Sequence, residues 1–302
     1  MIVKHNITAM NSNRMLNLTT SSQAKSTEKL SSGYKINRAA DDAAGLAISE
    51  KMRRQVRGLT QASANAQDGV SAVQTAEGAL NEVHDMLQRM NELAVKGENG
   101  TQTSTDRAYI AMEINQLMSE VDRVKNTTTF NEMSLLDGNF NKGLQVGAEA
   151  GQHINITIKD MSIEGIADQI KDRFKDTTDY KTQVINKFYG AAGFDPEELG
   201  GTGAKIPNET DYANLNKFVK GAIKAVSAQR SDLGAVQNRL EHTISNLDNI
   251  TENTQSAEAA IRDTDIATEM VKYANNNILQ QAGTSMLSQA NQGNQLALSL
   301  LG

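Results

Sequence analysis

Apolar side chains recur every seven residues along three separate stretches of the chain. The first stretch spans residues 59–94, with apolar or small residues at both positions of each repeat. Those residues are Leu59, Ala66, Val73, Leu80, Leu87 and Ala94, with Ala62, Gly69, Ala76, Val83 and Met90 as their companions. A heptad pattern kept over about five repeats predicts a coiled-coil helix, which at about 1.5 Å per residue would be roughly 50 Å long.

Two further heptad stretches follow. The second carries Ile110, Ile114, Leu117, Val121 and Val124. The third carries Val219, Val226, Leu233, Leu240, Leu247, Thr254 and Ile261, interleaved with Ala222, Val236, Ile250 and Ala257. Each stripe alone would remain in water, whereas burying one Leu, Ile or Val contributes roughly 1.5–3 kcal/mol. We therefore expect the three helices to pack as one bundle.

The pattern changes between the second and third stretches. Residues 144–146 and 153–158 alternate apolar and polar side chains, and the segment 147–151, bounded by glycines, joins them. This alternation predicts a β-hairpin. Ser162 is then placed to cap a helix. Its apolar face would be Ile163, Ile166, Ile170 and Phe174.

A short insert between the hairpin and the third stretch has its own character. It holds both prolines of the chain, and Asp195-Pro196 predicts the start of a short helix that Gly200-Gly201 ends. Seven of the twelve Phe and Tyr residues lie between Phe174 and Phe218. These features predict a small insert with its own core on one side of the bundle.

The two ends of the chain differ from the heptad stretches. No charged side chain occurs from Tyr273 to Gly302, a segment rich in Asn and Gln. The first forty residues carry apolar positions on a weakly basic strip in which Glu28 is the only acidic residue. An exposed lone helix normally carries charges on its wet face. We therefore expect the two ends to become stable helices only together and with neighbouring copies.

These patterns together predict a mainly α fold. It is a long helical coiled-coil or bundle rod built from both termini, with a β-hairpin and a small mixed insert in the middle.

The composition argues against one functional class. Lys and Arg number 30 against 36 Asp and Glu, a formal charge of -6, which argues against nucleic-acid binding because phosphate contacts need clustered positive charge.

Other features of the sequence exclude further classes. The chain has no Cys, so disulfides and thiolate chemistry are excluded. No apolar run approaches the roughly eighteen residues that cross a membrane, and no membrane insertion is expected. The opening residues lack the apolar segment of a secretory signal peptide. If the protein is exported, we expect a dedicated apparatus that cleaves no ordinary signal.

No residues suggest catalysis, a cofactor or a metal. The histidines, His5, His84, His153 and His242, are scattered without ligand spacing. Asp41-Asp42 can be interpreted as paired carboxylates, but a charge at a helix N-terminus or a hinge fits better. An enzyme within the insert is a possible alternative, yet residues 163–211 contain no defensible catalytic set. The chain is therefore predicted not to be an enzyme.

Several motifs closely resemble the signatures of one family, bacterial flagellin. At the amino-terminal end they are Leu30-Ser31-Ser32-Gly33-Tyr34-Lys35-Ile36-Asn37 and Ala40-Asp41-Asp42-Ala43-Ala44-Gly45-Leu46-Ala47-Ile48. At the carboxy-terminal end they are Asn238-Arg239-Leu240-Glu241, Asp263-Thr264-Asp265-Ile266-Ala267-Thr268-Glu269-Met270 and Leu298-Ser299-Leu300-Leu301. The resemblance covers roughly residues 1–160 and 212–302.

The resemblance implies a structural subunit that polymerises into the extracellular bacterial flagellar filament for swimming. Residues 1–41 and 265–302 would then be the terminal helices of the filament's inner core. Residues 42–160 and 212–264 would form the helical rod with its hairpin, and residues 161–211 a variable insert that faces outward. A hook–filament junction protein, which shares such ends, is the alternative.

The resemblance also implies partners. The main partner is a second copy of the chain itself, within a homopolymer. Others are a flagellar export chaperone, the filament cap and hook-junction proteins, and a host Toll-like receptor that senses flagellin. Export would proceed through the flagellar type III apparatus without a cleaved signal peptide.

Specific residues match the family's recognition positions. Arg89, Leu93 and Glu113 fall on receptor-contact positions, and a contact between subunits alone is the less favoured alternative for Arg89. Leu298, Leu300 and Leu301 match positions that serve assembly and that a cytosolic innate sensor reads in related flagellins.

Overall fold

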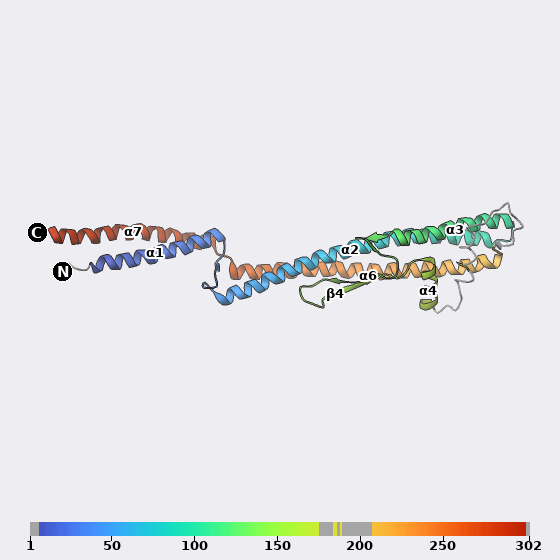
Figure 1. Ribbon diagram of the computed structural model, residues 1–302, viewed down its shortest axis with the longest axis horizontal. Helices are drawn as coiled ribbons and strands as arrows, with labels where there is room; N and C mark the ends of the chain where they lie inside the picture. The colour runs from blue at the N-terminus through green and yellow to red at the C-terminus, as the bar shows by residue number, and fades with distance from the viewer. Residues whose placement is uncertain (1–5, 175–183, 186–187, 189–206, 300–302) are drawn as a thin grey trace. The chain divides into compact units, whose positions relative to one another are not determined.

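The computed structural model describes residues 6–174, 184, 185, 188 and 207–299, without the side chains of residues 172–174 and 293–299 (Figure 1). The chain divides into two compact units. The terminal unit comprises residues 1–57 and 250–302, and the central unit comprises residues 58–249. Two long helices, α2 (Ala43–Glu98) and α6 (Glu209–Arg262), contribute to both units.

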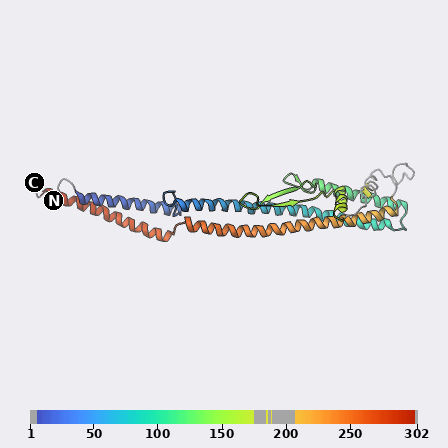
Figure 2. The ribbon, with the colours of Figure 1, turned by 90° about the horizontal axis from the view of Figure 1, so that it is seen from below.

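Two helices from opposite ends of the chain form most of the terminal unit. They are α1 (Ile7–Ser32) and α7 (Ile266–Ser299), and Figures 1 and 2 both show them side by side. The Asn6 side chain accepts a hydrogen bond from the Ala9 amide at 3.0 Å and caps α1. Its amide nitrogen also donates to the Ala290 carbonyl at 3.0 Å, so the two helices run antiparallel.

The segments that lead out of α1 and into α7 hold each other. α1 ends at Gly33, whose φ of 76° lies in the left-handed region that favours glycine. The Gly33 carbonyl accepts from the Thr264 amide at 3.0 Å, and the Lys35 amide donates to the Arg262 carbonyl at 2.7 Å. The Arg262 guanidinium stacks 4.7 Å from the Tyr34 ring centre and pairs with Glu50 at 2.7 Å.

Acidic side chains cap the N-termini of the helices that follow these segments. Asp42 accepts from the Gly45 amide at 2.9 Å at the start of α2, and Asp265 accepts from the Ala267 and Thr268 amides at the start of α7. The hydroxyl of Thr268 also donates to Asp265 and holds the pKa of that carboxyl below its usual value. The interpretation of Asp41-Asp42 as a charge at a helix N-terminus therefore agrees with the structure.

Three helices carry the core of the central unit, as the heptad pattern predicts. They are α2, α3 (Ser104–Thr127) and α6, and most of their buried apolar residues form one cluster. Leu59, Ala62 and Leu247 form a second, smaller cluster. The first heptad stretch is buried from Leu59 to Ala94. Burial of the third stretch ends at Leu247, and Ile250 is 36% exposed. Before Leu59 the buried residues of α2 are the small Gly45 and Ser49.

The predicted β-hairpin is present. It pairs β3 (Asn141–Gln145) with β4 (His153–Thr157), with Leu144 opposite Ile154. A smaller hairpin, β1 (Thr129–Phe130) with β2 (Met133–Ser134), precedes it. The β3–β4 hairpin lies against α2, where the Asn65 side chain donates to the Gln145 carbonyl at 3.0 Å.

A short helix follows the hairpin. It is α4 (Ile163–Phe174), and the Ser162 hydroxyl accepts from the Gly165 amide at 2.9 Å, as the predicted cap requires. Ile163, Ile166 and Ile170 are buried in the main cluster. The mainly α fold with its hairpin is thus confirmed. The short helix predicted after Asp195 lies outside the described residues.

The turn between α2 and α3 is fastened to the start of α6. The Tyr212 hydroxyl donates to the Arg107 carbonyl at 2.5 Å, and the Arg107 guanidinium pairs with Glu209 at 2.6 Å. The Tyr212 ring lies directly against Gly97 of α2, because a Cβ atom at position 97 would be 2.5 Å from Tyr212 Cδ1. Tyr212 is fully buried, and burial raises the pKa of its phenol.

Gly97→Ala is expected to lower the free energy of unfolding by about 1–3 kcal/mol, since the buried Tyr212 ring must shift to admit the methyl group. Gly78 of the same helix is the matched control, because nothing lies within 4 Å of a Cβ atom built there. Gly78→Ala should raise the free energy of unfolding by about 0.5–1 kcal/mol. Urea unfolding followed by circular dichroism measures both. Equal effects of the two substitutions would contradict this packing.

Candidate assembly surface

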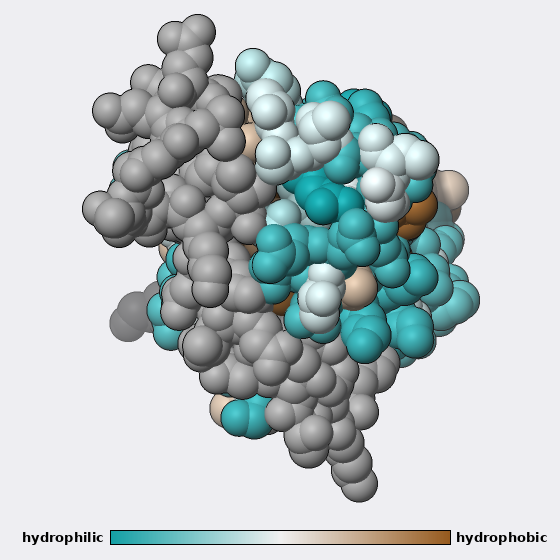
Figure 3. All heavy atoms as spheres, turned by 90° about the vertical axis from the view of Figure 1, so that its right-hand side faces the viewer, coloured by the Kyte–Doolittle hydropathy of each residue, from teal (hydrophilic) through white to brown (hydrophobic). Residues whose placement is uncertain are grey.

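Large apolar side chains are exposed mainly on the two terminal helices. Met10 is 68% exposed and Ile278 is 64% exposed. The whole set on these helices is Ile7, Met10, Met15, Leu18, Ile266, Met270, Val271, Ile278, Leu279 and Met286. By contrast, the described residues on the end face of the central unit in Figure 3 are mostly hydrophilic. We call the exposed set the outer apolar surface.

The covered side chains of the same helices also recur at heptad spacing. On α1 they are Ala9, Ser12, Leu16, Thr19, Gln23, Ser26 and Leu30. On α7 they are Glu269, Tyr273, Asn276, Gln280, Gly283, Leu287 and Ala290. We call these residues the terminal seam. Half of its members are polar, and several of the others are only Ala or Gly.

This arrangement reverses that of an ordinary coiled coil. Coiled coils normally bury apolar a and d residues between the helices and leave polar residues outside. Here the contact between α1 and α7 covers many small and polar side chains, and most of the large apolar ones face away. Each Leu, Ile or Met that stays in water forgoes roughly 1.5–3 kcal/mol of burial free energy. The helix pair therefore needs further partners to bury the outer apolar surface.

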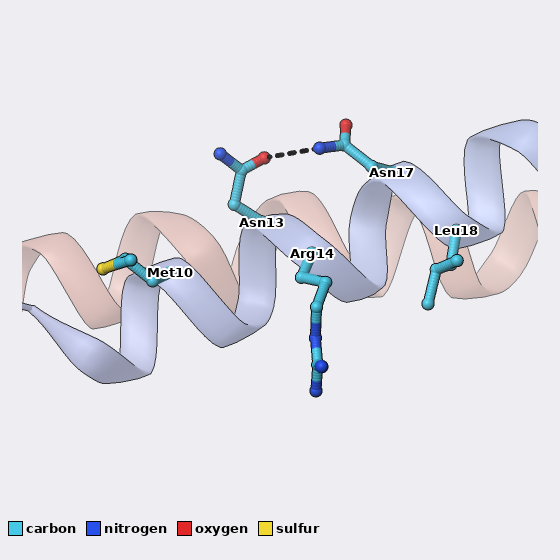
Figure 4. Close-up of a pocket in the computed structure, with 5 residues that line it drawn as sticks. All are labelled: Met10, Asn13, Arg14, Asn17 and Leu18. Atoms are coloured by element: carbon cyan, nitrogen blue, oxygen red, sulfur yellow. Dashed lines mark hydrogen bonds between the residues drawn. The ribbon is translucent and has the colours of Figure 1, made fainter.

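Part of the outer apolar surface forms a shallow hollow on α1, of about 430 Å³. Met10 and Leu18 lie at its two ends, with Asn13, Arg14 and Asn17 between them (Figure 4). α7 runs behind α1 in this view, so the hollow is open on the side away from α7. An apolar side chain from another molecule has room to enter here.

One buried carboxylate stands out in the terminal seam. Glu269 is 5% exposed, and its Oε1 accepts a hydrogen bond from the Ser26 hydroxyl at 2.7 Å. Lys272 Nζ lies 3.2 Å from the other carboxylate oxygen. The hydrogen bond from Ser26, supported by Lys272 and Lys29, holds the pKa of Glu269 below its usual value against the opposing effect of burial.

The residues at the predicted receptor-contact positions lie on α2 and α3. Arg89 Nη2 is 2.9 Å from Glu113 Oε1, and both side chains are about half exposed. Arg89 also pairs with Glu92 at 3.0 Å. Leu93 is only 2% exposed and belongs to the buried cluster. The structure thus brings Arg89 and Glu113 together at the surface, with Leu93 in the core.

The remaining residues singled out in the sequence are placed as follows. Leu298 lies in α7 but its side chain is not described, and Leu300 and Leu301 lie outside the described residues. His84 is half-buried beside Gln88, whereas His153 and His242 are exposed. Across the described part of the chain, no three His, Asp or Glu residues gather as metal ligands. Nor does any described helix combine the length and apolar character needed to span a membrane.

The fold and the outer apolar surface define a helical protein whose terminal helices require further chains. Sequence comparison identifies its family. The profile of the bacterial flagellin N-terminal helical region matches residues 3–141, and that of the C-terminal helical region matches residues 217–301. A flagellin of Halalkalibacterium halodurans is 46% identical over 305 residues, covering 100% of both chains. The chain belongs to the bacterial flagellin family.

Two further proteins are similar to this chain. The flagellar filament 31.3 kDa core protein of Treponema maltophilum is 44% identical over 306 residues and covers 100% of both chains. A solved structure described as a flagellar hook-associated protein of Vibrio parahaemolyticus has a TM-score of 0.57 at 13% identity, covering 74% of this chain and 100% of that one. At that identity the likeness concerns the fold alone.

Sequence reasoning missed the terminal seam. The signal was present, because Ser12, Thr19 and Ser26 recur every seven residues in α1. The usual heptad signal consists of apolar residues, whereas half of the covered positions here are polar. The buried carboxylate of Glu269 was missed for the same reason.

The α1–α7 contact should weaken in acid because of Glu269. A carboxyl group whose pKa is lowered on folding stabilises the folded state above its unfolded pKa, and this contribution is lost as the pH falls through the lowered value. The unfolded value is near 4.5, so the loss should develop below about pH 4.5. Amide hydrogen-exchange protection of α7, corrected for the intrinsic rate at each pH, measures it.

Glu269→Gln should give weaker protection at neutral pH and remove most of the decline in acid. Glu28→Gln is the matched control, because Glu28 is a more exposed acid that pairs with Arg38 at 2.9 Å. This control should keep the decline. An unchanged acid profile in Glu269→Gln would show that another group is responsible.

Proposed function

We propose that this chain is the structural subunit of a bacterial flagellar filament and that it polymerises through the α1–α7 pair. The observation that supports this most directly is the outer apolar surface, which faces away from a terminal seam that is half polar. Membership of the flagellin family supports it independently. The subunit acts by assembling and by transmitting torque passively along the polymer, without catalysing a reaction.

Assembly follows from the burial of the outer apolar surface against neighbouring copies. Side chains such as Met10, Leu18 and Ile278 are more than half exposed, so each can lose apolar area to a second subunit. Apart from its lysines and Glu269, the α1–α7 pair carries few charged side chains. Burial of the pair therefore transfers few charged groups out of water. The partner that fits this surface is a second copy of the same helix pair.

The filament subunit is favoured over the hook–filament junction alternative. The relatives that match over their full length at 44–46% identity are a flagellin and a filament core protein. The likeness to the hook-associated structure, at 13% identity, is one of fold alone. We therefore propose a long polymer rather than a junction of a few rings.

The roles that we propose for the segments of the chain are those implied by the family. We propose that residues 1–41 and 265–302 line the inner core of the filament, that residues 42–160 and 212–264 form the rod, and that residues 161–211 face outward. The non-helical segments 33–42 and 263–265 lie at the proposed boundaries, which supports this division.

The cellular setting is proposed on the same basis. The filament would lie outside the cell, and the subunit would reach it through the flagellar type III apparatus without signal cleavage. An export chaperone would hold the subunit before export, and the cap and hook-junction proteins would meet it at assembly. An exposed outer apolar surface is the kind of surface that a chaperone protects from aggregation.

A host Toll-like receptor is the proposed partner of the α2–α3 face. The ion pair between Arg89 and Glu113 is exposed, so both side chains are accessible to another protein. Leu93 is buried and would support this pair from beneath rather than touch a receptor. Leu298, Leu300 and Leu301 are proposed, by family resemblance alone, to serve assembly and cytosolic innate sensing.

Removal of residues after Ala274 should abolish filament growth on seeds and leave a soluble, partly folded chain, because most of α7 is lost. A finer test replaces Ile278 and Leu279 with Ser, which removes two exposed apolar side chains and adds no charge. Gln289→Ser, an exposed polar position of the same helix, is the control and should still polymerise. Electron microscopy scores filament growth. Normal filaments from the truncated chain would contradict the proposal.

Arg89→Asp should reduce activation of the flagellin-sensing Toll-like receptor at least about tenfold and should also disturb assembly, because it sets a third acid beside Glu92 and Glu113. Arg123→Asp is the matched control, since Arg123 is an exposed arginine of α3 that pairs with Glu120. A reporter cell assay measures activation. Full activation by Arg89→Asp would remove the receptor proposal and leave the filament proposal intact.

A further inference from the structure

Apolar packing alone does not fix the register of the α1–α7 pair, which is the position of one helix along the other. The terminal seam repeats small and polar residues every seven positions, such as Ser12, Thr19 and Ser26 on α1. A slip of α7 by one heptad would therefore exchange one small or polar side chain for another at many positions. Coiled coils with few distinctive core residues are prone to such slips, and a single buried polar group often sets their register.

The Glu269 carboxylate is the distinctive group in this seam. It is the only acidic residue of α7 and lies almost fully buried against α1. Both of its oxygens have partners, the Ser26 hydroxyl at 2.7 Å and Lys272 Nζ at 3.2 Å. Glu269 lines a second hollow, distinct from that at Met10 and Leu18. Its other lining residues include Lys25, Lys29, Ser22, Asn275 and Asn276.

We propose that the contact between Ser26 and Glu269 sets the register in which α1 pairs with α7. The inference rests on the proposed function, because the register decides which side chains of the two helices meet a neighbouring subunit together. Ser26 and Glu269 are positioning residues in this role. They act by fixing the outer apolar surface.

A slipped register would lose the hydrogen bond from Ser26, whereas Lys272 lies on α7 itself and moves with Glu269. If α7 moved by one heptad toward the start of α1, Glu269 would lie opposite Thr19, whose hydroxyl already donates to the Met15 carbonyl at 3.0 Å. No Lys or Arg occurs from residue 15 to residue 23, so the carboxylate would be covered without a cation from α1. Moved the other way, Glu269 would face Gly33, where α1 has ended. Leaving a buried carboxylate poorly paired is costly, so both slips are disfavoured.

The chain provides a clean test because it contains no cysteine. A Cβ atom built at Gly283 lies 3.9 Å from Leu16 Cβ, which is within the usual range of about 3.5–4.5 Å for a disulfide. Leu16→Cys with Gly283→Cys therefore reports the register seen in the structure. Leu16→Cys with Asn276→Cys reports the register slipped by one heptad. Both pairs remove the packing of Leu16 on Gly283, so this packing contributes to neither disulfide yield.

The yields of the two disulfides are compared in the full-length chain, both free and after growth on filament seeds. With Ser26 and Glu269 intact, the first pair should form at least about ten times more disulfide than the second. Glu269→Leu should lower this ratio at least about threefold, and Ser26→Ala should lower it by a smaller factor. The hydrogen bonds of Thr264 with Gly33 and of Lys35 with Arg262 remain in both variants and keep part of the preference. Glu28→Leu, at a more exposed acid, should leave the ratio unchanged.

Each other outcome overturns the proposal. A ratio that stays at tenfold in Glu269→Leu would show that the register is set elsewhere. Loss of both disulfides in Glu269→Leu would show that the carboxylate is needed for pairing and not for register, and loss of both in the unmodified background would show that the helices do not pair in this way. Electron microscopy of the same samples scores filament growth separately, so failure of the proposed function is visible apart from the disulfide ratio.

Discussion

The contact between α1 and α7 supplies too little apolar burial to account for the apolar residues that these helices carry. Their terminal seam covers Ser, Thr, Asn and Gln side chains, while Met10, Ile278 and others of similar size remain in water. The stabilisation available to the terminal unit therefore depends on neighbouring molecules. Under the proposed function, polymerisation and completion of the terminal fold are one process.

The central unit follows the opposite rule. Its heptad residues from Leu59 to Ala94 are buried within the chain, with α3 and α6 as partners. The unit needs no neighbour to cover its core, and Tyr212 fastens its end against Gly97. The same chain thus combines a self-sufficient unit with one that is completed by assembly. The change falls in α2 before Leu59, where the buried residues are the small Gly45 and Ser49.

Much of this architecture could be predicted from the sequence, because period-seven and period-two patterns report burial directly. The rod helices and the hairpin at Leu144 follow from them. The pairing of Glu269 with Ser26 could not be predicted, since a buried carboxylate is recognised only when the residue opposite is known. The burial of Leu93 could likewise not be predicted from the family motif, because a motif specifies which residue occupies a position and not how exposed its side chain is.

Methionine footprinting with peroxide tests the central claim most directly, because Met10 and Met286 are 68% and 60% exposed on the outer apolar surface. The account predicts that both thioethers oxidise readily in the free subunit and are strongly protected in the filament. Met90, which is fully buried in the central unit, should be protected in both states. Equal oxidation of Met10 and Met286 before and after polymerisation would contradict the account.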